Sequence, residues 1–274
     1  MGQQQVKKLL ELALLAGQIM CESQAESYRV EDTMNKILSL SQAAFAVGCS
    51  FSTNLLAIID DPKFESGAYV GVKRITSHSN NLNKIGQVTR ITDYFVQGQL
   101  DIDQTYTLLL NIRSGRNLYN PNRMALGIWG MTFCFTFLFD GGPFEGLTAA
   151  INGLVLALLF LGGNRFNFGT FFTNVIQASV VTLLPHLFQM YLWPDLASGT
   201  VVIASLMPLV PGTPFTTAVR DLFHEDFIAG SSRLVEALLT AGSLALGSII
   251  AFLILEGVFK WLLYFFIMPS FHWL

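Results

Sequence analysis

Long apolar runs alternate with short polar breaks through the second half of the chain. A helix needs about 20 apolar residues to cross the hydrocarbon core of a bilayer. The breaks are rich in Gly, Pro, Asn and Asp, which end or start helices. They delimit five predicted membrane spans, at about 121–139, 146–161, 168–192, 196–210 and 234–258. The pattern therefore predicts an α-helical integral membrane protein with about five transmembrane helices in residues 120–260.

The apolar, aromatic tail at 261–274 contains Pro269 and is too short for a normal span. We expect it to extend the fifth helix or to lie at the membrane interface.

The first 119 residues have a different pattern, in which helical and strand periodicities alternate. Ser23 and Glu26 are three residues apart and predict a capping box at the start of a helix. The predicted helices are 6–20, 23–38, 82–97 and a last one that ends near 112, and the predicted strands are 44–49, 53–59 and 69–75. Residues 1–119 are therefore expected to form an α+β domain with its own core.

Composition and charge agree with this division. The chain is 52% hydrophobic and 13% charged, against about 25% charged residues in soluble domains. Lys and Arg are absent from the predicted loops 140–145 and 193–195, whereas Arg165, Arg220 and Arg233 lie in the alternate loops. By the positive-inside rule, the N-terminal domain should be cytoplasmic and the protein should lie in the cytoplasmic membrane. The sequence has no basic patch, so we expect no nucleic-acid partner.

The sequence gives no indication of an enzyme, a metal or a cofactor. Cys21, Cys49 and Cys134 are widely spaced and match neither a disulfide framework nor a zinc site. The chain contains no GxSxG motif, no HExxH motif and no paired carboxylates within a predicted span. The expected class is a transporter.

A cluster of three prolines at 208, 211 and 214 predicts a break in the helical backbone. At membrane depth, broken backbone is tolerated where it is buried in protein or lines a polar cavity. Thr213 and Pro214 predict a new amphipathic helix over about 214–229, closed by Gly230. Its free amides would favour a carboxylate, so Pro211, Gly212 and Thr213 are candidate substrate-binding residues. The alternative is a plain exit loop after the fourth span.

Ionisable residues gather after this break. Asp221 and His224 are candidate proton-coupling residues, because histidine titrates near neutral pH. Glu26 is a third candidate, on the hypothesis that it lines the transport path with Arg29 and Glu31. The alternatives are a solvated helix face and an N-terminal domain that serves regulation or assembly.

Two polar residues in the third predicted span, Asn174 and Gln177, are three apart and share a helix face. Polar groups inside a span usually face the bundle interior. They are therefore candidate substrate-binding residues, and an interhelical hydrogen bond is the alternative role.

The placed motifs resemble the bacterial threonine/serine exporter family, specifically its short ThrE- or YjjP-like members. The resemblance covers the chain up to about residue 258. The matching pieces are Ala16-Gly17, Ser23-Gln24-Ala25-Glu26-Ser27 with Val30-Glu31, the Thr53 strand region, Arg74, Asn81-Leu82 with Lys84, Leu209-Val210-Pro211-Gly212-Thr213-Pro214, Ala218, Asp221, and Gly230 with Arg233. Where the family often has Gly-Ala-Glu-Ser, this chain has Gln24 in place of the glycine.

The resemblance implies export of small metabolites driven by the proton-motive force. Threonine and serine are the substrates that name the family, and dicarboxylates such as succinate are implied for split members. It also implies that a short chain works with a second small membrane subunit, and the odd number of predicted spans allows a paired partner or a homo-oligomer. The competing hypothesis is a non-transporting membrane scaffold or sensor with a regulatory cytoplasmic domain.

Overall fold

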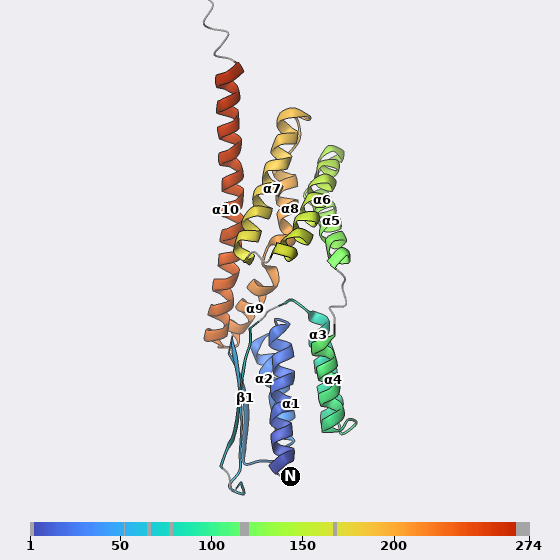
Figure 1. Cartoon of the computed structure of the whole chain (residues 1–274), viewed down its shortest axis with the longest axis vertical. Coiled ribbons are helices and arrows are strands. Elements are labelled where there is room, and N and C mark those ends of the chain that lie inside the picture. The colour runs from blue at the N-terminus through green and yellow to red at the C-terminus, as the bar shows by residue number, and fades with distance from the viewer. Residues whose placement is uncertain are drawn as a thin grey trace, which may run out of the picture. The chain divides into compact units, whose positions relative to one another are not determined.

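The computed structural model describes residues 3–51, 53–64, 67–76, 79–115, 121–166 and 169–266, with the backbone alone at 164–166 and 258–266. The chain divides into two compact units. Residues 1–116 and 212–237 form the N-terminal unit, and residues 117–211 and 238–274 form the membrane unit (Figure 1). The N-terminal unit therefore includes a segment from beyond the proline cluster.

A three-stranded antiparallel sheet of order β1-β2-β3 forms one layer of the N-terminal unit. The strands are β1 Phe45–Ser50, β2 Asn54–Asp60 and β3 Tyr69–Arg74, so the three predicted strands are confirmed to within one residue at each end. The helices are α1 Gln3–Glu22, α2 Ser27–Ser39, α3 Leu82–Val96, α4 Ile102–Ser114, α9 Gly212–Phe223 and the first turns of α10.

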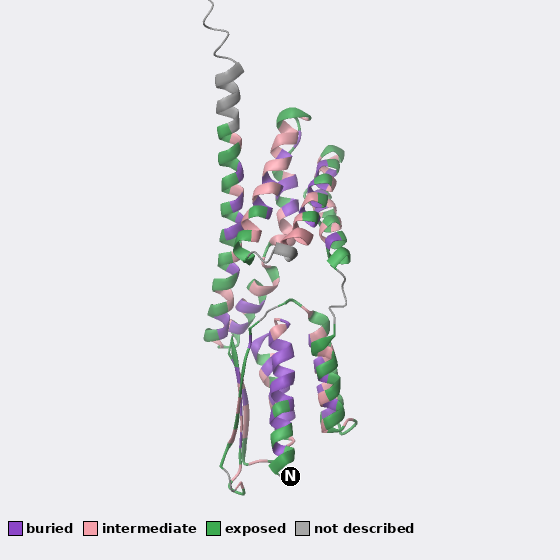
Figure 2. Cartoon of the chain, viewed as in Figure 1, coloured by how far each residue is buried: buried purple, intermediate pink, exposed green. Residues whose placement is uncertain are grey.

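Helix α1 is the core of this unit, because it packs against the sheet as well as against α2, α3 and α4. Figure 2 shows it as mostly buried, and Leu9, Leu12, Ala13 and Ala16 have no exposed surface. The layers are thus the sheet, then α1 with α2, then α3 with α4. Gly71 lets the sheet approach α1, since a Cβ there would lie 2.5 Å from a methyl carbon of Leu14.

The turn between α1 and α2 corrects the predicted capping box at Ser23. The backbone N–H of Ala25 donates to Met20 O and that of Gln24 to Cys21 O, both at 3.0 Å. With Gln24 at φ 63°, this is a Schellman motif that ends α1. Ser23 therefore belongs to the end of α1, and Glu26 is the N-cap residue of α2.

Helix α9 ends at Phe223 and α10 begins at Phe227, so the prediction that Gly230 closes one helix over 214–229 was wrong. Glu225 adopts φ 64° in the connecting turn, and Asp226 Oδ1 accepts the backbone N–H of Ala229 at 3.1 Å, as an N-cap does. Gly230 lies inside α10 instead. A Cβ there would come within 3.0 Å of the backbone nitrogen of Leu222, so the glycine allows α10 to pack closely on α9.

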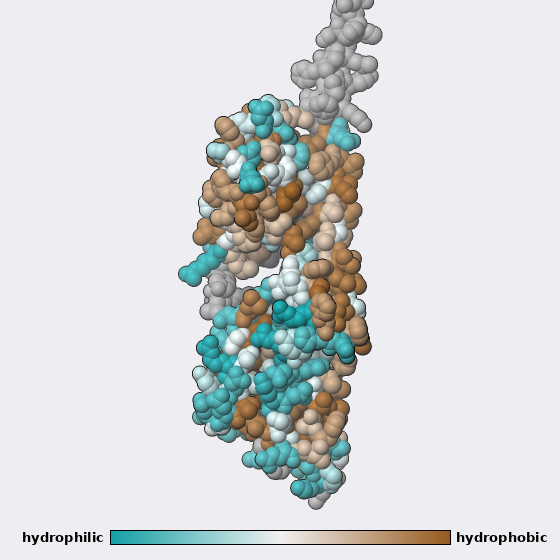
Figure 3. Space-filling view, turned by 180° about the vertical axis from the view of Figure 1, so that it is seen from behind, coloured by the Kyte–Doolittle hydropathy of each residue, from teal (hydrophilic) through white to brown (hydrophobic). Residues whose placement is uncertain are grey.

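The membrane unit contains α5 Pro121–Leu138, α6 Pro143–Phe166, α7 Thr170–Tyr191, α8 Ser198–Leu206, a short 3-10 helix at Met207–Leu209 and the remainder of α10. Figure 3 shows mostly apolar side chains over this unit. Helix α6 continues through the glycines at which its end was predicted. Gly163 packs against Thr173 of α7, and this close approach between helices explains the absence of a larger side chain.

By length and apolarity, three of the described helical segments can cross a membrane: Pro143–Gly163, Thr170–Tyr191 and Phe227–Gly257. Helices α8 and α9 would add a fourth if the broken pair formed one span. The prediction of about five spans is therefore too high by this criterion. Helix α5 has 18 residues, and Asn122 and Arg123 in its first turn reduce its apolar length.

Replacing Gln24 with glycine should stabilise the chain by about 1 kcal/mol, because glycine adopts a positive φ without a steric penalty. Thermal unfolding in detergent should shift upward by a few degrees. Gln24→Ala is the matched control and should give no such gain. An unchanged or lower midpoint for Gln24→Gly would show that the left-handed turn costs nothing here.

Candidate functional site

A carboxylate from α9 is buried against the N-terminus of α2. Asp221 has no exposed surface, and its Oδ1 accepts the backbone N–H of Ser27 at 3.0 Å. Ser27 is the first residue of α2, whose N-terminus has free amides and a positive dipole end. The two partners are 194 positions apart in the sequence, so the contact joins distant parts of the chain.

Arg233, in the second turn of α10, balances the charge of Asp221. Its Nη1 lies 3.0 Å from Asp221 Oδ2, and the two are oriented as an ion pair rather than as a well-aligned hydrogen bond. Its Nη2 donates to the backbone carbonyl of Ala25 at 2.7 Å. Because both charged side chains are largely buried, loss of either would leave the other without compensation.

Glu26 forms a second, more open part of the same cluster. Its carboxylate pairs with Arg29 at 3.3 Å and also with Arg220. Burial acts to raise the pKa of Glu26, but its own backbone N–H and the two guanidinium groups outweigh that effect and hold the pKa below its ordinary value of 4.5. Asp221 differs, because burial raises its pKa above 3.8 despite the opposing charge of Arg233 and the amide of Ser27.

His224 lies beside the cluster and is exposed. Its ring stacks on Tyr28 with centroids 4.4 Å apart and planes at 3°, and its Nδ1 lies 2.9 Å from the backbone carbonyl oxygen of Arg220. The structure thus brings Glu26, Asp221 and His224 to one end of α2, and Asp221 is the deeply buried member.

Two neighbours of Glu26 have separate roles. Glu31 accepts the backbone N–H of Ser50 at 2.8 Å and so connects α2 to the end of β1. Arg29 stays partly exposed beside Glu26.

The helix breaks at the proline cluster, as predicted. Helix α8 ends at Leu206, the 3-10 turn follows, and Val210 is extended with ψ 132°. Helix α9 starts at Gly212, which is earlier than the predicted cap at Thr213. Pro214 is tolerated in this first turn because helical amides there need no partner. Thr213 Oγ1 accepts a hydrogen bond from Asn80 Nδ2 at 2.9 Å.

Within the membrane unit, a polar seam crosses the packed helices. Asn152 of α6 donates through Nδ2 to Val181 O at 3.0 Å and to Ser205 Oγ at 2.7 Å. The Ser205 hydroxyl donates its hydrogen to Val201 O at 2.7 Å. Toward Asn152 the Ser205 oxygen must therefore act as an acceptor, which identifies the nearby side-chain atom of Asn152 as the donor Nδ2. Asn152 Oδ1 is then buried with no hydrogen-bond partner within the described part of the chain.

The seam continues where α7 meets α10. Thr182 Oγ1 and Ser248 Oγ lie 3.1 Å apart, and Ser179 donates to Gly247 O at 2.9 Å. A Cβ on Gly247 would lie 2.4 Å from Val175 O. The glycine therefore permits the close helix contact on which these hydrogen bonds depend.

The two polar residues predicted from the third span differ in their surroundings. Gln177 is buried and lines a cavity of about 190 Å³ together with Leu158, Leu159, Gly162, Gly163, Thr173 and Ile176. Asn174 is half-buried and is not among these lining residues. Sequence reasoning missed Asn152 and Ser205, although a polar residue within the apolar run 146–161 was a detectable signal.

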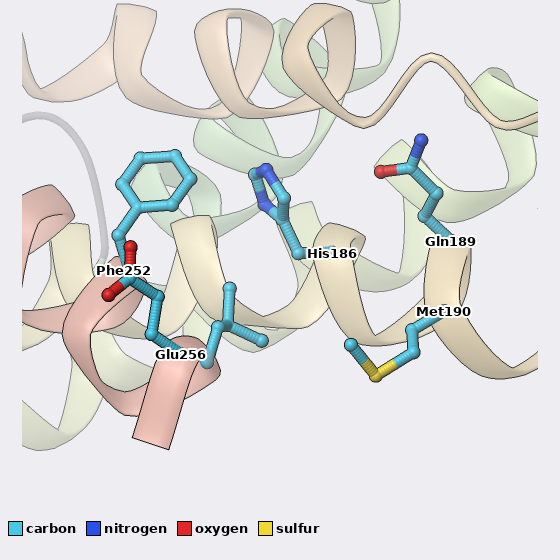
Figure 4. A pocket seen from close by; sticks show the side chains of 6 residues that line it. His186, Gln189, Met190, Phe252 and Glu256 are labelled. Atoms are coloured by element: carbon cyan, nitrogen blue, oxygen red, sulfur yellow. The ribbon is translucent and has the colours of Figure 1, made fainter. Parts of the chain in front are cut away.

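A second cavity of about 400 Å³ lies between α7 and α10 (Figure 4). Its lining residues are His186, Gln189, Met190, Phe252, Leu255 and Glu256. The His186 ring meets Phe252 edge-on at 5.0 Å, and its Nδ1 lies 2.8 Å from Thr182 O. Neither of these two cavities is lined by Pro211, Gly212 or Thr213.

Several apolar helices and a buried polar seam between them are features of a multi-pass membrane transporter. The sequence agrees at the level of the family. Residues 11–255 match the family model described as "ThrE: Putative threonine/serine exporter", and the chain belongs to this threonine/serine exporter family. No curated protein and no solved structure matches it.

The lowered pKa of Glu26 makes part of the stability dependent on pH. Since its folded pKa lies below its unfolded value near 4.5, its contribution is complete above that value and is lost as pH falls through the folded pKa. Glu26→Gln should therefore flatten the loss of thermal stability between about pH 6 and about pH 3. Glu225→Gln, an exposed change outside the ion pairs, should leave the wild-type slope, and equal slopes for all three proteins would contradict the assignment.

Proposed function

We propose that this protein exports threonine and serine across the bacterial cytoplasmic membrane, with the seam around Asn152 as part of the substrate path. The observation that carries the proposal is the unpartnered, fully buried Asn152 Oδ1. A buried acceptor without a partner costs about 1–3 kcal/mol, and the hydrocarbon interior offers no water to satisfy it. The ammonium or hydroxyl group of a hydroxy-amino acid would supply the missing donor.

The neighbouring groups suit such a substrate. Ser205 and Thr182 add hydroxyls from α8 and α7, and the Nδ2 of Asn152 stays engaged with the protein. This arrangement holds the amide in place while its oxygen remains available. Gln177, on the small cavity, is a further proposed contact, and Asn174 on the same helix is a weaker one.

A carboxylate is also proposed to bind to the backbone amides at the start of α9, at a point of the transport path separate from the seam. The donors are the backbone N–H groups of Gly212 and Thr213, in the first turn of α9, where amides need no helical partner. Pro211 has no N–H, and its proposed part is to end the preceding helix. The same chemistry would accept a dicarboxylate such as succinate, which is the alternative substrate class. The proposed carboxylate site rests on the break in the helical backbone at the proline cluster and on the dipole of α9.

Proton coupling is proposed for Asp221, with Glu26 and His224 as supporting groups. Burial raises the pKa of Asp221 above its ordinary value despite the opposing charge of Arg233, so this carboxylate takes up a proton more readily than an exposed one. Its partner Arg233 lies on α10, the helix that also carries Ser248 of the polar seam. We further propose a cytoplasmic N-terminus and assembly with a second small membrane subunit or with another copy of the chain.

Asn152→Leu should lower threonine efflux about ten-fold or more, because a charge-assisted hydrogen bond to the substrate is lost. Efflux of labelled threonine from preloaded cells would measure it, with the amount of protein in the membrane checked in parallel. The matched control is Thr136→Val, since Thr136 is equally buried but its hydroxyl bonds within its own helix, to Thr132 O. Wild-type efflux by Asn152→Leu would refute the assignment of the seam.

Asp221→Asn should separate coupling from substrate binding. The amide retains an acceptor for the Ser27 N–H but cannot carry a proton on and off. Because it also leaves Arg233 without its ionic partner, the amount of folded protein is measured in parallel. We expect threonine exchange across proteoliposomes that contain the chain and its partner to continue, while acceleration by an imposed pH gradient disappears. Glu225→Gln is the control and should keep that acceleration, and a full response to the gradient by Asp221→Asn would exclude Asp221 as the coupling group.

A further inference from the structure

The sheet of the N-terminal unit has one covered face and one open face. Side chains alternate between the two, and the glycines identify the covered one, because a Cβ on Gly48 would meet Met34 of α2 and one on Gly71 would meet Leu14 of α1. The alternate positions therefore point away from the helices. On this open face the apolar residues are Phe45, Val47, Cys49, Leu56, Ile58, Val70 and Val72.

These side chains form two complete apolar rows across the three strands. Val47, Ile58 and Val70 are register partners in one row, and Cys49, Leu56 and Val72 are partners in the next. Val70 is 57% exposed and Val72 65% exposed. The helices that pack on the sheet, α1 and α2, lie on the opposite face. Contiguous exposed apolar surface of this kind indicates an interaction site.

Charges mark the two ends of the open face with opposite sign. Asp60 lies at the end of β2, beside Phe45. Arg74 lies at the opposite end of the sheet, beside Asn54. Both side chains point to the same side of the sheet as the apolar rows, and both are exposed. The face is thus acidic at one end, apolar in its centre and basic at the other end.

We propose that this open face is a homodimer interface, in which the sheets of two copies pack face to face. The two-fold axis lies in the plane between the sheets and runs perpendicular to the strands. In this arrangement the strands of the copies run antiparallel, so the Asp60 end of each faces the Arg74 end of its partner. The two apolar rows exchange places and cover each other. Sheets packed in this way lie about 10 Å apart and cross at about 30°.

The charge pattern selects this arrangement over other occupants. A two-fold axis parallel to the strands would set Asp60 against the partner's Asp60, which is unfavourable. A lipid surface would not need the acidic end. Strand spacing and rise give the open face dimensions of about 14 Å by 20 Å, or about 280 Å². This area is smaller than the roughly 800 Å² that each partner buries in a standard interface. We therefore expect dimers in the membrane, where confinement raises the effective concentration, and dissociation on dilution in detergent.

Cross-linking of the full chain in membranes tests the proposal. In a Cys49→Ser, Cys134→Ala background, Val70→Cys places a thiol on the open face, and Glu11→Cys places one on the exposed side of α1 as the control. A short bismaleimide should give covalent dimers from Val70→Cys and none from Glu11→Cys. Addition of Val72→Asp should reduce the dimer about ten-fold, since the two-fold axis repeats the buried charge in both copies.

A charge exchange makes the test specific for the antiparallel arrangement. Asp60→Arg alone and Arg74→Glu alone should each reduce cross-linking at Val70→Cys several-fold, and the double variant should restore it. Unchanged thermal unfolding in detergent would show that all variants are folded. Equal cross-linking of both cysteine positions, or no rescue by the double exchange, would overturn the proposal.

Discussion

One buried ionic contact determines how the N-terminal unit is assembled. Asp221 reaches the first amide of α2, and Arg233 holds both that carboxylate and the carbonyl of Ala25. Through these bonds, α9 and the first turns of α10 join a fold whose other elements all lie within the first 116 residues. The contact needs the α1–α2 turn in its observed shape, because that turn presents the carbonyl of Ala25 and the amide of Ser27 next to each other. The Schellman turn and the ion pair are therefore parts of a single constraint.

The same cluster shows what the sequence could predict and what it could not. Helical and strand periodicity placed the strands and most helices correctly, since each depends on local alternation. Asp221 was predicted from its position after the helix break, and Glu26 from the hypothesis that it lines the transport path with Arg29 and Glu31. The structure places both at the N-terminus of α2. Their shared location, the N-terminus of α2, was not predictable, because the sequence pattern predicted the N-cap of that helix at Ser23. A left-handed residue at Gln24 is hard to anticipate where the chain lacks the glycine that usually marks it.

The membrane unit was predicted less well, for a physical reason. Apolar runs give the approximate position of a helix, but its ends depend on packing. Gly163 and Gly230 were both interpreted as helix ends, and both lie where a neighbouring helix or turn approaches closely. Inside a helix bundle, glycine serves close packing as often as it serves termination. The polar seam was missed for a related reason, since Asn152 and Ser205 become partners only after α6 and α8 pack together.

The seam and the ionic cluster differ in how their buried polar groups are paired. In the cluster, these charges have partners of opposite sign: Asp221 is balanced by Arg233, and Glu26 by Arg29 and Arg220. In the seam, the hydrogen bonds of Asn152 hold its amide fixed but leave one acceptor unused. Paired charges specify structure, whereas a fixed acceptor with neither a hydrogen bond nor an ionic partner is suited to a ligand that arrives and leaves. Since α10 contributes Arg233 to the first and Ser248 to the second, a protonation change at Asp221 that frees Arg233 would act on the helix that also lines the seam.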